Sequence, residues 1–322
     1  MRIVIVTPAG PRQRTGNRQT ALRWARLLRQ LGHQVWIATR WEGQPADLLI
    51  ALHARRSRRS IHRFHFRHPT RPLVVVLTGT DLYRDLPHDA AARRSLDMAS
   101  RVVVLQEEGR RALSGRWRRK TSVVYQSAPA GQPLPPDRDF TVCVVGHLRE
   151  EKDPFRCAQA LCHLPPTSRI QVRHLGRALD GAHETQARYL NASLPRYHWL
   201  GEVDRRQVRA IMRQSRLLVV SSRMEGGANV IAEALAVGLP VLASQVPGNV
   251  GMLGRDYAGY FPVGDERTLA MLLGRAESNP AFLASLAAQC QRRARRMTPA
   301  RERRALARVI DSARRRAQKR HR

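Results

Sequence analysis

Several residue types are scarce in this chain, and their scarcity argues against several classes of protein. The four cysteines among 322 residues form no CxxC pair, so we expect reduced, mostly buried thiols rather than a disulfide framework or a zinc site. No apolar run approaches the roughly 20 residues that span a bilayer. The first apolar run ends at Pro8, short of the ~7–15 residues of a signal-peptide core, so we expect a cytoplasmic protein.

Acidic residues are also scarce, and this sets the charge. Against 57 Lys and Arg there are 25 Asp and Glu, which gives a formal net charge of +32 and a pI near 11.7. Such a charge favours anionic partners: nucleic acid, acidic lipid or phosphorylated small molecules. Nearly all of the excess is arginine, spread over the whole chain, and aromatic residues make up only 5%. No nucleic-acid-binding motif accompanies the charge, so we expect no specific nucleic-acid partner and keep that function as a remote alternative.

The alternation of apolar runs with helical stretches predicts two doubly wound α/β domains. Uniformly apolar strands separated by helices are typical of parallel sheets that are covered on both faces. We predict strands within residues 2–8, 34–39, 47–53, 72–80, 101–106, 121–127, 141–147, 169–176, 197–203, 216–222 and 240–246. Residues 130–139, AGQPLPPDRD, are predicted to be a linker. We expect an N-terminal domain at 1–133, a C-terminal domain at 134–297, and a basic helix at 298–322 that packs back on the N-terminal domain.

The stretch SSRMEGGANVIAEALAVGLPVLAS, residues 221–244, places two of the scarce acids eight positions apart. We predict a strand, a turn at RMEGGA, and a helix from Asn229, as N-cap, to about Val237. Backbone N–H groups of the turn and helix start suit a diphosphate. Glu225 and Glu233 accept hydrogen bonds only, so vicinal hydroxyls of a ribose and a hexose are their natural partners.

This string resembles the EGxxxxxxEAxAxGxPVxAS signature of retaining GT-B glycosyltransferases, family 4. The resemblance implies two Rossmann-like domains facing each other across a cleft and a nucleotide-diphosphate-sugar donor. It implies that Glu233 holds the ribose and that Glu225 contacts the donor sugar. VVGHLREEKDP, residues 144–154, is similar to the GRLxxxKG element, which puts Lys152 at the diphosphate and His147 where the family has arginine. The full predicted donor set is Gly146, His147, Arg149, Lys152, Gly176, Gly201, Glu225, Gly226, Gly227, Ala228, Asn229 and Glu233.

We predict no metal and no cofactor. The DRD at residues 137–139 matches the DxD metal motif of another glycosyltransferase fold, but it lies in the proline-rich linker before a strand. A lysine, nearby arginines and a helix N-terminus can neutralise a diphosphate without a divalent ion. His62, His65 and His68 are interpreted as one face of a basic surface helix rather than as metal ligands.

The loops of the N-terminal domain are predicted to bind the acceptor. Residues 7–17, TPAGPRQRTGN, form a glycine-containing turn with arginines, which suits a small phosphate. Residues 77–86, LTGTDLYRDL, follow a strand and place Asp81 near the predicted reacting centre. The predicted acceptor set is Arg12, Arg14, Thr15, Gly16, Asn17, Thr78, Gly79 and Thr80, and the predicted catalytic residues are Lys152, Glu225 and Asp81.

Five stretches together resemble a narrower group, the selenosugar synthases of selenoneine biosynthesis. They are ALHARRSRRSIHRFH, LTGTDLYRD, TGNRQTA, GHLREEKDP and MEGGANVIAEALA. The resemblance implies transfer of a sugar, typically N-acetylglucosamine, from its UDP derivative to selenophosphate, with formation of a C–Se bond and release of UDP. We expect no peripheral membrane contact. An alternative is a family 4 enzyme that acts on a lipid or saccharide at an anionic membrane through the basic helix near residues 55–67.

Overall fold

The computed structural model describes residues 1–13, 15–135 and 139–319. The chain divides into two compact units. The first unit holds residues 1–126, 225–227 and 299–322, and the second unit holds residues 127–224 and 228–298. Each unit is built on one six-stranded sheet, and every strand pair recorded in the two sheets is parallel. Both belong to the α/β class, as the alternating sequence pattern predicted.

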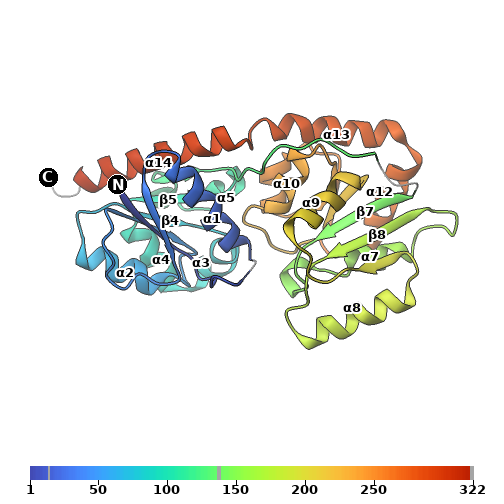
Figure 1. The fold of residues 1–322 in the computed structure, drawn as a ribbon, viewed down its shortest axis with the longest axis horizontal. Coiled ribbons are helices and arrows are strands. Elements are labelled where there is room, and N and C mark those ends of the chain that lie inside the picture. Colours follow the sequence, from blue (N-terminus) through green and yellow to red (C-terminus); the bar gives the residue numbers. More distant parts are fainter. Residues whose placement is uncertain (14, 136–138, 320–322) are drawn as a thin grey trace. The chain divides into compact units, whose positions relative to one another are not determined.

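The first sheet has the strand order β2-β1-β3-β4-β5-β6. Its strands β4 and β5 are labelled in Figure 1, together with helices α1 and α14. Its central strands β3 and β4 are buried at every position, which requires helices on both faces. The strands are β1 Arg2–Val6, β2 Gln34–Ala38, β3 Leu48–Leu52, β4 Leu73–Val76, β5 Arg101–Val104 and β6 Thr121–Val123. The helices are α1 Gly16–Arg29, α2 Arg58–Arg67, η1 Asp81–Asp85, α3 Leu86–His88, α4 Ala90–Met98, α5 Glu107–Arg111, α6 Gly115–Arg118 and α14 Pro299–Lys319.

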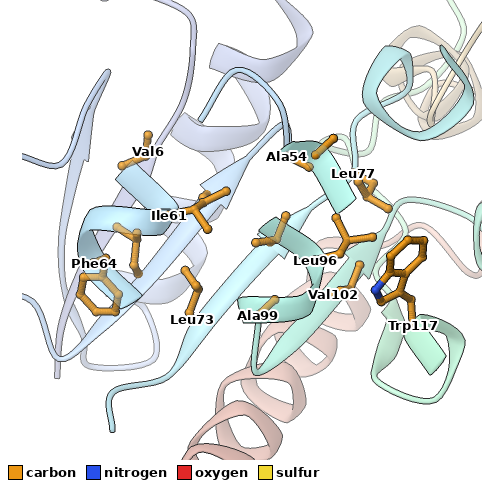
Figure 2. Close-up of a cluster of buried hydrophobic side chains, with 14 of the residues drawn as sticks. Val6, Ala54, Ile61, Phe64, Leu73, Leu77, Leu96, Ala99, Val102 and Trp117 are labelled. Carbon is orange, nitrogen blue, oxygen red and sulfur yellow. The ribbon is translucent and has the colours of Figure 1, made fainter. Parts of the chain in front are cut away.

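Alternate side chains of these strands enter two separate apolar cores, one on each face of the first sheet. On one face, Ile61 and Phe64 of α2 and Leu96 of α4 pack with Leu73 of β4 (Figure 2). On the other face, Leu28 of α1 packs with residues of the C-terminal helix α14 in a second buried cluster. The chain therefore returns to the first sheet at its C-terminal end.

The second sheet has the order β12-β11-β10-β7-β8-β9. Its strands are β7 Phe140–Val145, β8 Ile170–Leu175, β9 Tyr197–Trp199, β10 Leu217–Val220, β11 Val241–Ser244 and β12 Tyr260–Phe261. Its helices are η2 Glu150–Lys152, α7 Arg156–Leu161, α8 Gly181–Ser193, α9 Arg205–Gln214, α10 Asn229–Ala236, α11 Pro247–Leu253, α12 Glu266–Ser278 and α13 Pro280–Ala294. No helix among the described residues has the length and apolar character needed to cross a membrane.

Every predicted strand is present, and β12 is the one that the sequence did not reveal, because two residues after a glycine carry no periodic signal. The predicted N-cap is wrong by one residue. Asn229 is the first residue of α10, and Ala228 is its N-cap.

The predicted linker is bound along the second unit by backbone hydrogen bonds. The N–H of Gly131 donates to the carbonyl of Ala236 over 2.9 Å, and the N–H of Leu134 donates to the carbonyl of Arg213 over 2.8 Å. The guanidinium of Arg213 also donates to the carbonyl of Gln132 over 2.6 Å. A proline-rich segment has few ladder donors of its own, so the arginines of α9 satisfy its carbonyl groups instead.

A buried carboxylate anchors α14 to α1. The side chain of Glu302 is 0% exposed and accepts hydrogen bonds from Arg23 Nε over 3.0 Å and from Trp24 Nε1 over 2.8 Å. A buried charge is tolerated only when it is paired and hydrogen-bonded, and here both neighbours come from one helix.

Replacing Glu302 with alanine is expected to destabilise the first unit by about 3 kcal/mol, because Arg23 and Trp24 would keep their burial and lose their acceptor. Guanidinium unfolding followed by tryptophan fluorescence measures the effect. The control is E184A, which removes an exposed pair with Arg188 and should cost less than about 1 kcal/mol. Equal losses in the two variants would contradict the anchoring role.

Candidate functional site

In a parallel sheet the carboxyl ends of all strands meet at one edge, and ligands of such sheets bind there. The predicted donor residues follow β7, β8, β9 and β10 of the second unit, and the predicted acceptor residues follow β1 and β4 of the first unit. Glu225, Gly226 and Gly227 are buried, and their contacts group them with the first unit.

The loop that carries Lys152 is held by the loop after β10. The hydroxyl of Ser221 donates to the carbonyl groups of Lys152 over 3.1 Å and of Asp153 over 2.8 Å. The N–H of Arg223 donates to the carbonyl of Glu151 over 2.9 Å. These bonds position Lys152 through its backbone. Its side chain is partly exposed, so a ligand can reach the ammonium group.

Asp153 ends the Lys152 loop in a left-handed backbone conformation. Its φ of +45° is uncommon for a residue other than glycine. The carboxylate pairs with Arg156 over 2.9 Å and lies 3.6 Å from Arg223, and Arg156 also pairs with Glu266. A strained residue that is held by several partners is typical of a functional loop.

A close backbone approach joins the loops after β7 and β8. A Cβ atom placed on Gly176 would lie 1.9 Å from the carbonyl oxygen of Gly146, so only glycine fits at this position. His174 is buried beneath the same loop, and its Nδ1 lies 2.7 Å from the Tyr197 hydroxyl. Burial lowers the pKa of His174 to about 4, while a hydrogen bond to the backbone of Gly146 opposes that shift. A neutral imidazole therefore supports the glycine loop.

The remaining predicted donor residues lie along the same edge. His147 and Gly201 are partly exposed. Arg149 is exposed, and its Nε lies 4.0 Å from the carboxylate of Glu151. His147 is thus less exposed to solvent than Arg149.

The N-terminus of α10 has no side-chain cap, and neither have those of η2, α7 and α11 in the same unit. Helices α8, α9, α12 and α13 of the same unit begin at Asp or Asn residues whose side chains accept backbone hydrogen bonds. Ala228 caps α10 with no side-chain hydrogen bond, and its methyl group cannot accept one.

Glu233, one turn into α10, is 32% exposed and lies 3.6 Å from Arg205 at the start of α9. No sequence pattern indicated this arginine, because the two residues are 28 positions apart and strand β10 lies between them.

The loop after β1 caps the first helix through Thr15. The Thr15 hydroxyl accepts the N–H of Arg18 over 3.4 Å, and Thr20 donates to the carbonyl of Gly16 over 3.0 Å. Asn17 is inside α1, and Arg12 is exposed before it. Arg14 lies outside the described residues, as do residues 137 and 138 of the DRD segment.

The loop after β4 is organised around Asp81, whose carboxylate faces the interior of the loop. It is 0% exposed and accepts the N–H groups of Thr78 over 2.8 Å, Gly79 over 3.0 Å and Ala54 over 2.9 Å. The sequence placed Asp81 toward a reacting centre. The geometry gives it a positioning role instead, since it ties the loops after β3 and β4 together.

His53, after β3, was missed by the sequence analysis. It has a φ of +71°, is 2% exposed, and places Nε2 3.1 Å from the Thr80 hydroxyl. Burial lowers the pKa of its imidazole, against the opposing charge of Asp81. A lone histidine at a strand end has no sequence pattern that distinguishes it from a core residue.

The three histidines of the IHRFHFRH segment do not form one helical face in full. His62 and His65 lie within α2, and His68 follows the end of the helix as its C-cap. In the described part of the chain, no group of three or more His, Cys, Asp or Glu side chains has a geometry that could hold a metal.

The pKa of His174 predicts a pH dependence of stability. Because the pKa falls from 6.5 to about 4 on folding, its contribution is fully present above pH 6.5 and is lost as the pH falls toward 4. We expect the difference in unfolding free energy between wild type and H174Q to narrow by about 2 kcal/mol from pH 7.5 to pH 5. Y197F keeps the imidazole and should keep the wild-type pH dependence. A difference that does not vary with pH would contradict the assignment.

Comparison with known proteins agrees with this geometry. HepE from Anabaena, solved with UDP and glucose, superposes with a TM-score of 0.76 at 18% identity, over 97% of this chain and 100% of that one. Its complex with UDP-glucose gives 0.75 at 19% identity, with the same coverage. Sucrose-phosphate synthase from Thermosynechococcus elongatus gives 0.77 at 17% identity, over 96% of this chain and 98% of that one. These likenesses show the GT-B fold. A search of curated proteins found no match.

A family model described as "Glycosyl transferases group 1" matches residues 130–297, just over half of the chain. The matched segment contains the Lys152 loop, the Gly146–Gly176 contact and α10. The chain therefore belongs to the group 1 glycosyltransferase family.

Proposed function

We propose that this protein is a selenosugar synthase, which transfers a sugar from a UDP-sugar to selenophosphate with retention at the anomeric carbon. N-acetylglucosamine is the proposed sugar, and the proposed reaction needs no metal or cofactor and occurs in the cytoplasm. The broader part of the proposal, a UDP-sugar donor, is supported by the family and by the UDP and UDP-glucose complexes of HepE.

The single observation that carries the donor assignment is the start of α10. Its N-cap, Ala228, supplies no side-chain oxygen to the backbone N–H groups of the first turn. A phosphate can take the place that a capping oxygen occupies elsewhere, with favourable interaction with the helix dipole. We assign the diphosphate to this position, with Gly226, Gly227 and Asn229 around it and with Lys152 as its balancing charge.

The carboxylates are assigned to the hydroxyl groups of the donor. Glu233 is partly exposed on α10 and would accept hydrogen bonds from the ribose, in place of Arg205. Glu225 would contact the donor sugar. Gly146, His147, Arg149, Gly176 and Gly201 would line the donor site.

The acceptor is assigned to the loops of the first unit. The exposed Arg12, together with Arg14, would supply positive charge, and Thr15, Gly16 and Asn17 would supply the start of α1. Thr80 would supply a hydroxyl donor, and Thr78 and Gly79 would line the site while their backbone N–H groups donate to Asp81, which holds the loop. Short polar loops of this kind suit a small tetrahedral anion.

The proposed reaction is a front-side substitution. The bond from the anomeric carbon to the diphosphate oxygen breaks, the selenium–carbon bond forms on the same face, and UDP leaves with the bonding electron pair. Lys152 and the α10 N-terminus stabilise the charge that develops on the leaving diphosphate. Selenophosphate is already an anion and needs little help from a general base. Water then cleaves the P–Se bond, which gives phosphate and the selenosugar.

One observation favours a second candidate, transfer to a lipid or saccharide at an anionic membrane. Phe66 on α2 is 72% exposed and stands among the exposed Arg63 and Arg67. An apolar residue surrounded by cations is typical of a helix that lies on an anionic bilayer. Co-sedimentation with vesicles that contain phosphatidylglycerol, abolished by F66S, would favour this candidate.

The experiment that tests the proposal measures UDP release from UDP-N-acetylglucosamine under anaerobic, reducing conditions, with and without selenophosphate. Release that depends on selenophosphate, with a selenium-bearing sugar in the mass spectrum, is the expected result. Release without selenium in the product, or no release, would reject the proposed acceptor.

Replacing Glu233 with glutamine is expected to weaken UDP binding about ten-fold while the fold is kept, because the amide is a poorer acceptor for the two ribose hydroxyls. Isothermal calorimetry with UDP measures the change. E184Q, on the exposed face of α8, is the matched control and should bind UDP as the wild type does. Unchanged affinity in E233Q would remove Glu233 from the donor site.

A further inference from the structure

The hydrogen bonds of His53 identify which ring nitrogen carries the proton. The backbone N–H of Arg56 donates to His53 Nδ1 over 3.3 Å, so Nδ1 acts as an acceptor. In a neutral imidazole the other nitrogen must then carry the hydrogen. His53 Nε2 lies 3.1 Å from the Thr80 hydroxyl oxygen, so the ring donates to that oxygen.

The surroundings of His53 keep this arrangement in place. The ring is 2% exposed, and burial lowers its pKa, which favours the neutral form. The charged groups that face it are Asp81, Asp85, Arg55 and Arg56, two of each sign. Asp81 lies 3.9 Å from Nδ1 and Asp85 lies 3.9 Å from Nε2, beyond hydrogen-bond distance.

The backbone at His53 is in an uncommon conformation that positions the ring. Its φ of +71° is in the left-handed region, which histidine visits less often than glycine but more readily than branched residues. The N–H of the next residue, Ala54, donates to the buried carboxylate of Asp81. The ring and the neighbouring peptide are thus bound to the same loop after β4.

We infer that His53 is a positioning residue that makes the Thr80 hydroxyl a hydrogen-bond donor to the anionic acceptor. A hydroxyl that accepts from the ring can turn its own hydrogen only toward another partner. Thr80 is partly exposed, so that partner can be a bound ligand. An oxyanion accepts hydrogen bonds and donates none when it is fully ionised, so the tautomer of a buried ring favours an anion at Thr80. This inference rests on the proposed function, which places the acceptor in the first unit.

The test is a double-mutant cycle that measures the binding of thiophosphate, an acceptor-like anion, to the UDP-saturated full chain by calorimetry. Thr80→Val removes the hydroxyl and is expected to weaken binding about ten-fold, as for a hydrogen bond to a charged group. Thr80→Ser restores the hydroxyl and should bind within about two-fold of the wild type. His53→Asn tolerates the left-handed backbone and keeps an acceptor for Arg56, but its shorter amide does not reach Thr80.

We expect His53→Asn to weaken thiophosphate binding in the wild-type background and to add nothing in the Thr80→Val background, because His53 acts through the hydroxyl. UDP affinity should be unchanged in all variants. Equal binding by Thr80→Val and wild type, or a further loss when His53→Asn is added to Thr80→Val, would overturn the inference.

The ring nitrogens of the wild-type protein give a measurement that does not depend on any variant. Nitrogen-15 chemical shifts should show a protonated Nε2 and an unprotonated Nδ1 in His53, and the reverse tautomer would also overturn the inference. Selenophosphate turnover by the wild type judges the proposed function separately. Thr80-dependent thiophosphate binding without that turnover would reject selenophosphate as substrate and keep the anion site at Thr80.

Discussion

Within each of the two sheets the strands are parallel, so the predicted functional loops lie at the carboxyl edge of a sheet. No paired strand follows such a loop directly to fix its position. In an antiparallel hairpin a loop is closed by its own two strands, but here the chain leaves through a helix. Each loop must therefore be fixed by the loop beside it. Ser221 fixes the backbone after Lys152, Gly176 receives the carbonyl of Gly146, and Asp81 binds the peptide of Ala54.

Acidic residues are scarce, and several of the buried ones hold loops or helices in place. The chain has 25 acidic residues against 57 Lys and Arg, and three of its buried acids have several hydrogen-bond or ion-pair partners. Asp81 takes three backbone N–H groups, Glu302 takes an arginine and a tryptophan, and Asp153 takes Arg156. Each of these three carboxylates holds a loop or a helix in place, and the excess of arginine supplies the positive field of the protein.

The fold could be predicted from the sequence because each buried parallel strand is recognisable from its own apolar run. A run such as LLIAL or LVVV is apolar on both faces and needs no knowledge of its neighbours. The donor residues remain a prediction, which rests on glycines, a lysine and two glutamates that lie in short strings with fixed spacing. His53, Arg205 and His174 could not be predicted, because each acts on a residue from another loop. The burial of the Asp81 carboxylate was likewise invisible, since its partners at Ala54 are 27 positions away.

Acceptor-binding residues that depend on contacts between loops are harder to predict from sequence than donor-binding residues that lie in short local strings. A diphosphate can be bound by backbone N–H groups and one cation, and these depend on glycines and a helix start rather than on particular side chains. A small tetrahedral anion must instead find individual donors at the right places. The proposed donor in the first unit, the Thr80 hydroxyl, is positioned by a tertiary contact with the ring of His53, and the Asp81 carboxylate holds the same loop. In the proposed function the acceptor is therefore recognised by residues from pairs of loops, and such pairs become visible only once the strands are placed side by side.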